Sequence, residues 1–346
     1  MYPPIQSRST RRLLAAIAVA LLCAACGNAT GAPSAATLSS SDSTSTASTS
    51  SVGTGTGTAT TSTTPALPGT GRPAITVGDK NYTEQFVLGQ LYVQALTAQG
   101  FTATLNQNIG PTQVTVQALK AGSLSMYPEY LNVFNSAVAG YTHGFHNQLD
   151  AYQAAQHYAL GHGLQLLAPT PFSDTDALAV TDAYAAQNQL RTIGDLRKVA
   201  KQLTIGGAPQ FQQDSPGLPS IAQAYGVIPA AFKALAVGAQ YAELNAAVVQ
   251  AAYVNTTDAE LATGDYQLLG DPRQIFGSGN VVPVVAAKVL AEEGPAFVDV
   301  IQRVDEKLTI DAIRQMNEAV DIAQQDPATV AKQFLETHGL LTPGVY

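Results

Sequence analysis

The only thiol groups of this chain lie near its beginning, where they indicate a modification. Cys23 and Cys26 are the two cysteines. Three arginines within residues 8–12 precede an apolar run, 13–22, which is too short to span a membrane comfortably. Small residues stand directly before Cys26, as in bacterial lipoprotein signals, whereas an ordinary cleaved signal needs no cysteine there. We therefore expect residues 1–25 to be removed and Cys26 to carry a lipid that holds the chain on the outer face of the cell membrane.

Histidines are the other candidates for chemistry. His143, His146 and His157 have a spacing that could hold a metal ion, although solvated surface histidines are the commoner explanation. The sequence contains no G-x-S-x-G nucleophile motif, and the expected processing leaves no cysteine as a free nucleophile. We therefore expect no enzyme, no metal and no cofactor. An exported hydrolase stays an alternative, because the order of triad residues along a chain is not fixed.

The charge balance excludes several classes of partner. The chain is 46% hydrophobic and 12% charged, with 17 basic and 25 acidic residues. Removal of the three arginines of the signal leaves 14 basic residues against the same 25 acidic ones. So acidic a protein is not expected to bind nucleic acid, or to bind anionic lipid by charge. The lipid on Cys26 is the membrane contact that we expect.

The elements that must position any site begin only after a long polar segment. Residues 26–73 consist almost entirely of Ser, Thr, Gly, Ala and Pro, and such a segment buries too little apolar surface to fold. We expect a disordered tether there and one folded domain over residues 74–346.

Strands and helices alternate along the folded part, which predicts an α/β fold with mainly parallel sheets. Thr83 is expected to cap the first helix, Gly100 to end it, and Asp195 to complete the cap of a later one. The same alternation repeats after Leu164, and two lobes with a cleft fit about 270 residues better than a barrel. Strands are expected over 75–78, 101–105, from 126, over 178–180, 203–206 and 281–285, and helices from 83, over 113–121 and over 192–200.

Four short motifs resemble one known family. Residues 77–85 (VGDKNYTEQ), 127–130 (YPEY), 171–180 (PFSDTDALAV) and 334–341 (FLETHGLL) are similar, in order and spacing, to substrate-binding proteins of glycine betaine/choline/carnitine (osmoprotectant) ABC importers. The resemblance covers essentially everything after the tether. It implies a two-lobed type II periplasmic-binding-protein fold, with lobe 1 at about 74–172 plus 283–346 and lobe 2 at about 173–282. It also implies a monomer that binds a small polar solute and works with the permease and ATPase subunits of an importer.

The resemblance also points to site residues, some kept and some changed. Family members enclose a quaternary ammonium group in aromatic faces and hold the carboxylate with donors. This sequence keeps Lys80 of the first motif and Tyr130 of YPEY. An aromatic of the family falls at Asp176, an arginine at Asp214 and another aromatic at Asn255. We take these five as the substrate-binding candidates.

Two further departures concern the walls of the site. The Thr-Gly-Thr that usually follows YPEY is Leu131-Asn132-Val133, and a third aromatic falls at Gly279. Carboxylates and an amide accept from hydroxyl or amine groups, so the ligand is expected to be a small polar solute other than glycine betaine. The alternatives are an ordinary quaternary-ammonium binder, with a wall rebuilt by Tyr127 or Tyr225 or with a different alignment near Asp214, loss of binding, and a surface adhesin or sensor on the same fold.

Overall fold

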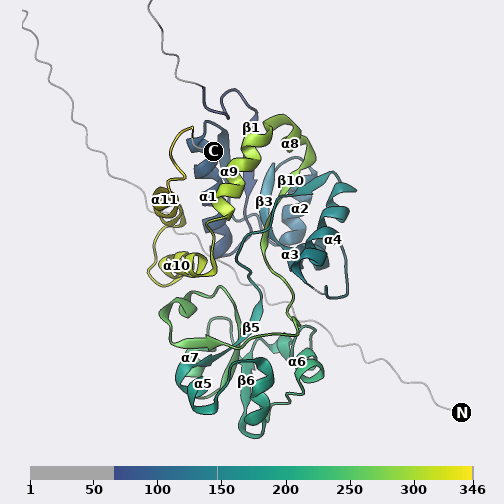
Figure 1. Cartoon of the computed structure of the whole chain (residues 1–346), viewed down its shortest axis with the longest axis vertical. Coiled ribbons are helices and arrows are strands. Elements are labelled where there is room, and N and C mark those ends of the chain that lie inside the picture. Colours follow the sequence, from purple (N-terminus) through teal and green to yellow (C-terminus); the bar gives the residue numbers. More distant parts are fainter. Residues whose placement is uncertain (1–65, 146, 345–346) are drawn as a thin grey trace, which may run out of the picture. The chain divides into compact units, whose positions relative to one another are not determined.

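The computed structural model describes residues 66–145 and 147–344. Cys26, His146 and the expected signal peptide lie outside these residues, as does nearly all of the expected tether. The described residues belong to one compact unit, Thr63–Tyr346. This unit contains two five-stranded sheets, each the centre of one lobe (Figure 1).

The sheet of the first lobe has the strand order β2-β1-β3-β10-β4. Strands β1, β2 and β3 run parallel, while β10 is antiparallel to β3 and to β4. The polypeptide thus returns to this sheet through β10 after it has built the second lobe. The strands are β1 (Ala74–Gly78), β2 (Thr102–Asn106), β3 (Met126–Tyr130), β4 (Leu164–Leu166) and β10 (Val281–Ala286).

Helices cover this sheet, and α1 is the most buried of them. Its Val87, Leu88 and Leu91 are fully buried against the C-terminal helices α9 and α11. The cap differs from the expectation: Tyr82 is the N-cap residue, and the Thr83 hydroxyl donates instead to Asp321. The helical segments of this lobe are α1 (Thr83–Ala98), α2 (Thr112–Lys120), α3 (Leu131–Val133), η1 (Phe134–Val138), α4 (Gln148–Leu160), α8 (Ala287–Glu293), α9 (Pro295–Asp305), α10 (Ile310–Asp321) and α11 (Pro327–Thr337).

The second lobe has the strand order β7-β6-β8-β5-β9 and its own apolar core. β6 is parallel to β7 and β8, whereas β5 is antiparallel to β8 and β9. The strands are β5 (Asp176–Thr181), β6 (Thr204–Gly207), β7 (Ala231–Ala234), β8 (Ala251–Asn255) and β9 (Tyr266–Leu268). The helical segments are α5 (Asp182–Asn188), η2 (Ile193–Lys198), η3 (Ala200–Gln202), η4 (Pro209–Gln212), α6 (Leu218–Tyr225), α7 (Gln240–Asn245) and η5 (Ala259–Thr263).

The α-helix expected over residues 192–200 is wrong, because this segment forms the 3₁₀ turns η2 and η3. The expected cap is confirmed: Thr192 and Asp195 form a capping box, and the Asp195 carboxylate also accepts from the Arg191 N–H. Gly194 is the second residue after the N-cap Thr192, and glycine in a helix interior is unfavourable, so a short 3₁₀ turn forms in place of an α-helix.

Two crossing segments join the lobes, and they pair with each other where they meet. Ser173 and Asn280 form an isolated antiparallel bridge. The Asn280 side chain donates to the carbonyls of Thr170 and Phe172 at 2.9 and 3.0 Å. A Cβ atom on Gly279 would lie 1.7 Å from the carbonyl oxygen of Asp174, so only glycine fits this crossing.

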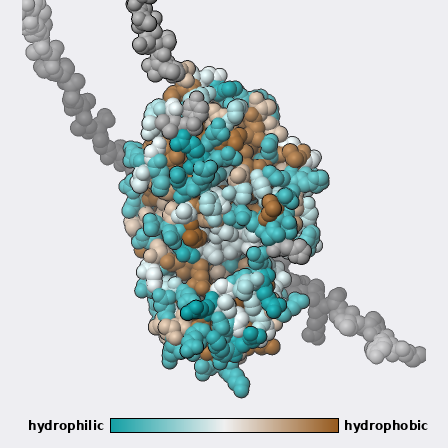
Figure 2. Space-filling view, in the orientation of Figure 1, coloured by the Kyte–Doolittle hydropathy of each residue, from teal (hydrophilic) through white to brown (hydrophobic). Residues whose placement is uncertain are grey.

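In Figure 2, hydrophilic residues cover most of the visible face of both lobes, and apolar residues form small separate areas. No helix among the described residues has the length and apolar character needed to cross a bilayer.

Candidate functional site

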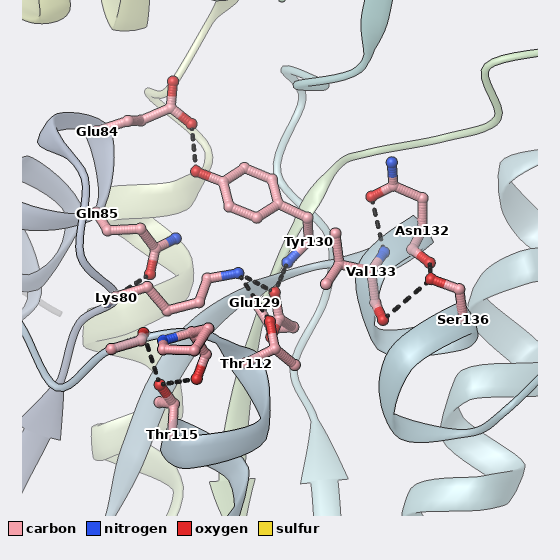
Figure 3. A network of polar contacts seen from close by, with 12 residues as sticks. Lys80, Glu84, Gln85, Thr112, Thr115, Glu129, Tyr130, Asn132, Val133 and Ser136 are labelled. Carbon is pink, nitrogen blue, oxygen red and sulfur yellow. Dashed lines mark hydrogen bonds and ion pairs between the residues drawn. The ribbon is translucent and has the colours of Figure 1, made fainter. Parts of the chain in front are cut away.

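Lys80 and Tyr130, the two family residues that the sequence keeps, lie together in the first lobe. Lys80 follows β1 and is 4% exposed. Its ammonium group pairs with Glu129 and lies 3.4 Å from the Thr112 hydroxyl (Figure 3). The Thr112 hydroxyl donates to the other Glu129 oxygen at 3.0 Å. Lys80 also stands 4.7 Å from the centre of the Tyr130 ring, so its charge is held by its own lobe.

Tyr130 connects this ion pair, through a chain of hydrogen bonds, with a contact between the lobes. Its hydroxyl donates to Glu84 at 2.6 Å. The other Glu84 oxygen accepts from the Asn317 amide at 2.9 Å, and that amide also donates to the Thr257 carbonyl of the second lobe at 2.9 Å. Burial raises the pKa of Glu84, and its hydrogen bonds oppose the shift. We call Lys80, Glu129, Tyr130, Glu84 and Asn317 the junction network.

A second contact between the lobes lies beside it. The Arg314 guanidinium on α10 donates through Nε to the Thr256 carbonyl at 2.8 Å. The Thr256 hydroxyl in turn donates to the Ser173 carbonyl at 2.7 Å and accepts from the Thr175 N–H at 3.0 Å. Helix α10 is therefore attached to the second lobe at the point where that lobe meets the crossing segments.

Three acidic residues of the second lobe lie near this junction. Burial, and then the charge of Glu84, raises the pKa of Asp174 well above its usual range, and no described donor reaches its buried Oδ1. Burial likewise raises the pKa of Asp176, whose Oδ1 accepts from the Tyr253 hydroxyl at 2.7 Å. Asp258 has its pKa raised by burial to about 6. Such shifts gather where carboxylates face a ligand or each other.

The remaining two candidates from the sequence lie farther out. Asn255 pairs with Asp176 in the register of β8 and β5, its side chain is exposed, and its N–H donates to Asp258 at 3.2 Å. Asp214 is exposed just after η4, next to Ser215 and Pro216, which line a cavity. The structure thus brings Lys80 and Tyr130 together in one lobe and Asp176 and Asn255 together in the other, and it leaves Asp214 apart.

That cavity lies between the lobes and has a volume of about 540 Å³. From the first lobe it is lined by Asn132 and Asn135 of the turn after β3, and by the loop 141–145. From the second lobe it is lined by Asp176, by residues 215–216 and by residues 274–278. We call it the interlobe cavity. Its volume is typical of pockets for small organic solutes.

The aromatic residues of the region are not those that the sequence suggested. Tyr127 is fully buried in a core of the first lobe. Tyr225 lies in the core of the second lobe, where its hydroxyl donates a hydrogen bond to Asp271. Instead Tyr82 stacks on Tyr130, with ring centres 6.0 Å apart. Tyr82 belongs to the first family motif, so its position beside Lys80 was a usable signal.

A second aromatic group was missed as well. Tyr141, His143 and Phe145 occur at every second position, a spacing that places side chains on one side of an extended segment. Their rings contact one another, with centres 5.2–5.6 Å apart, and all three line the interlobe cavity. His143 is therefore part of an aromatic cluster, while its expected partner His146 lies outside the described residues.

Comparisons with known proteins show which family model and which proteins this sequence is similar to. The family model "Substrate binding domain of ABC-type glycine betaine transport system" matches residues 73–337. A glycine-betaine-binding protein of Pseudomonas aeruginosa is 29% identical over 284 residues, which cover 78% of this chain and 89% of that protein. The glycine betaine-binding protein YehZ of Escherichia coli is 27% identical over 293 residues, covering 79% and 93%.

Solved structures show the same architecture. The crystal structure of a glycine betaine/carnitine/choline ABC transporter protein has a TM-score of 0.73 at 21% identity, over 77% of this chain and 99% of that one. Apo YehZ from Escherichia coli has a TM-score of 0.68 at 26% identity, with the same coverage. These neighbours are two-lobed periplasmic binding proteins, so the two-lobed type II fold expected from the sequence is confirmed.

Proposed function

We propose that this chain, which belongs to the family of substrate-binding domains of ABC-type glycine betaine transport systems, captures a small polar solute outside the cytoplasm and delivers it to an importer. Members of the family are extracytoplasmic and work with permease and ATPase subunits. This membership favours solute binding over the exported hydrolase considered above. We propose a monomer, with the permease as its protein partner.

Membrane attachment is the second part of the proposal. The basic residues, the short apolar run and the small residues before Cys26 support a lipid anchor at that cysteine. The tether expected over residues 26–73 would then link the lipid to the binding domain. Cys26→Ser should release the protein from the membrane fraction or block its processing. A variant that fractionates and migrates like the natural protein would refute the anchor.

The observation that carries the proposed ligand is the interlobe cavity with Asp176 in its wall. A solute held there touches both lobes, so it stabilises a closed arrangement of them. We propose that the solute bears hydroxyl or amine groups that donate to Asp176, with Asp214 and Asn255 at the rim. Lys80 and Tyr130 belong to the proposed set from the first lobe through the family motifs, although neither is among the residues that line the cavity. Because Glu129 already holds Lys80, this lysine reaches a solute only by giving up part of that ion pair.

A quaternary ammonium ligand is the second candidate. The stacked pair of Tyr82 and Tyr130 favours it, because aromatic faces attract a cation that cannot donate hydrogen bonds, and a ligand would share these faces with the Lys80 ammonium, 5.6 and 4.7 Å from their centres. The relatives named for glycine betaine point the same way. The two candidates differ in the role of Asp176, since only the first needs its acceptor oxygen.

Calorimetry separates them. Glycine betaine, choline, polyols and primary amines are each titrated into the natural protein and into Asp176→Ala and Asp214→Ala. We expect glycine betaine to bind weakly, and the preferred solute to lose at least about tenfold in affinity in each variant. Asp299→Ala, at an exposed position of α9, is the matched control. Glycine betaine binding at micromolar concentration, undiminished in both variants, would establish the quaternary-ammonium candidate instead.

A further inference from the structure

The wall of the interlobe cavity that comes from the first lobe begins with an unusual helical turn. After β3 the chain forms α3 and then the π-helix η1, closed by the Ala139 N–H donating to the Phe134 carbonyl at 2.9 Å. A π turn adds one residue to the normal spacing and is frequent at functional sites. Here it carries Asn135 and Ser136 into the cavity wall.

Asn135 presents a hydrogen-bond acceptor without a donor. Its side chain is 3% exposed, and its Nδ2 donates to the Ala151 carbonyl at 3.0 Å, which fixes the orientation of the amide. No donor among the described residues reaches its buried Oδ1. A buried acceptor of this kind costs free energy unless a donor from outside the protein, on a ligand or a water molecule, pairs with it.

The opposite wall presents a second acceptor, which carries charge. Asp176 uses one oxygen for the Tyr253 hydroxyl, and within the described part of the chain its other oxygen makes no hydrogen bond. It is the only acidic residue among those that the structure shows lining the cavity, and no Lys or Arg lines it there. The cavity therefore favours a donor with positive charge.

The third feature of the cavity is its aromatic side. The rings of Tyr141 and Phe145 stand at 90° to each other with centres 5.5 Å apart, and His143 leans on Phe145 at 5.2 Å. The Tyr141 N–H donates to the Asn135 carbonyl at 2.9 Å, so this loop is attached to the π turn that carries the free acceptor. Ring faces and edges at this position favour a flat apolar group, and a ring face also attracts a cation.

We propose that the interlobe cavity takes an organic ammonium ion whose N–H groups donate to Asp176 and Asn135 and whose flat apolar body packs against Tyr141 and Phe145. This inference rests on the proposed function and specifies its ligand class. A quaternary ammonium ion lacks the N–H donors, an alcohol lacks the charge, and an alkyl amine lacks the flat body. Each omission should therefore lower the affinity separately.

Four probes test the three features by calorimetry with the purified protein at neutral pH. Phenethylamine carries all of them, phenethyl alcohol lacks the charge, phenethyltrimethylammonium lacks the N–H donors, and hexylamine lacks the ring. We expect phenethylamine to bind at least about tenfold more tightly than the alcohol or the quaternary ion, and about threefold more tightly than hexylamine.

Two variants tie the result to the cavity. Asp176→Asn keeps the shape but removes the charge, and should weaken phenethylamine at least about tenfold. Phe145→Ala should weaken phenethylamine about threefold and leave hexylamine nearly unchanged. Asp299→Asn makes the same charge change at an exposed position of α9 and should have no effect. Thermal unfolding of each variant without probe identifies any that fail to fold, and the probe series on the natural protein stands independently of them.

The outcomes separate this inference from the function on which it rests. Equal binding of phenethyl alcohol, or phenethylamine binding unchanged in Asp176→Asn, would overturn the inference. Absence of phenethylamine binding at millimolar concentration would overturn it as well. Binding of a polyol that depends on Asp176, with no amine bound, would overturn the inference and leave the proposed function standing.

Discussion

The junction network and the interlobe cavity both lie where the two lobes meet, and they differ in how far their polar groups are paired within the protein. In the junction network the Lys80 ammonium faces Glu129, and both oxygens of Glu84 accept hydrogen bonds. In the cavity an oxygen of Asp176 and Oδ1 of Asn135 have no donor among the described residues. The first region makes its ion pair and most of its hydrogen bonds within the protein, with only the Asn317 Oδ1 left without a donor among the described residues, whereas the second has an acceptor without a described donor on each wall.

This difference separates structural from ligand-binding residues better than residue type does. A buried charge with its partner in the protein stabilises one arrangement of the chain, whereas an acceptor without a partner in the wall of a cavity is available to a solute. By this criterion, Lys80 and Tyr130 belong first to the internal structure of the first lobe. Substitutions in the junction network should therefore change stability, and substitutions in the cavity should change binding.

The largest expected effect is that of Lys80→Ala. The substitution leaves the fully buried Glu129 carboxylate without its ammonium partner, and breaking such a pair costs about 3–5 kcal/mol of unfolding free energy. Chemical denaturation measures it. Lys198→Ala removes an exposed ion pair with Asp195 and should cost less than about 1 kcal/mol. Equal losses in the two variants would mean that the junction network does not stabilise the fold.

The sequence predicted the lobes and the kept residues, because periodicity and short motifs are local signals. Strand β1 and the start of helix α1 were found in this way. It did not predict that Lys80 is held by Glu129, that Asn317 from the C-terminal part reaches Glu84, or that Asn135 is left unpaired. Contacts between positions more than 200 residues apart, as from Asn317 to Glu84, depend on how the C-terminal helices pack against α1.

Gly279 shows the same limit from the other side. The sequence presents it as a lost aromatic wall. In the structure, any side chain there would collide with the Asp174 carbonyl, so the crossing segments approach too closely for an aromatic residue. The aromatic surface comes instead from Tyr82 and from the loop 141–145. A single substituted motif position thus says little about the walls of the binding site until the backbone conformation at that position is known.

A pH prediction concerns Asp79, a buried carboxyl outside the cavity that has one oxygen without a donor among the described residues. Asp79 is buried beneath α1 with no described donor for its Oδ2, and burial raises its pKa to about 7, against one hydrogen bond from the Asn108 N–H that lowers it. The folded-state pKa of Asp79 lies above its unfolded-state pKa. The contribution of Asp79 to the unfolding free energy is therefore fully present below about pH 4 and is lost as the pH rises toward 7.

We expect unfolding free energy to fall by about 2–3 kcal/mol between pH 5 and pH 8, at about 1.4 kcal/mol per pKa unit. Asp79→Asn keeps an acceptor for the Asn108 N–H and removes the charge, so it should flatten this profile and raise stability at pH 8. Denaturation at several pH values measures both. An unchanged slope in the variant would assign the pH dependence to other carboxyls, such as Asp258, whose pKa is about 6.

The smallest expected change in unfolding free energy comes from comparing Asn317→Ala in the junction network with Asp176→Asn in the cavity. Asn317→Ala takes one donor from the buried Glu84 and removes the bond to the Thr257 carbonyl, so it should cost about 1–2 kcal/mol of unfolding free energy. It should also increase the radius of gyration measured by small-angle scattering, because one bond between the lobes is lost. Asp176→Asn should change stability by less than about 0.5 kcal/mol, since the Tyr253 hydroxyl keeps an acceptor and the charge that is removed is only half-buried. Its effect should fall on solute affinity instead. Asn317→Ala could instead prove neutral while Asp176→Asn unfolds the domain. The junction network would then not stabilise the fold, Asp176 would be a structural residue, and the division between structural and ligand-binding residues would be wrong.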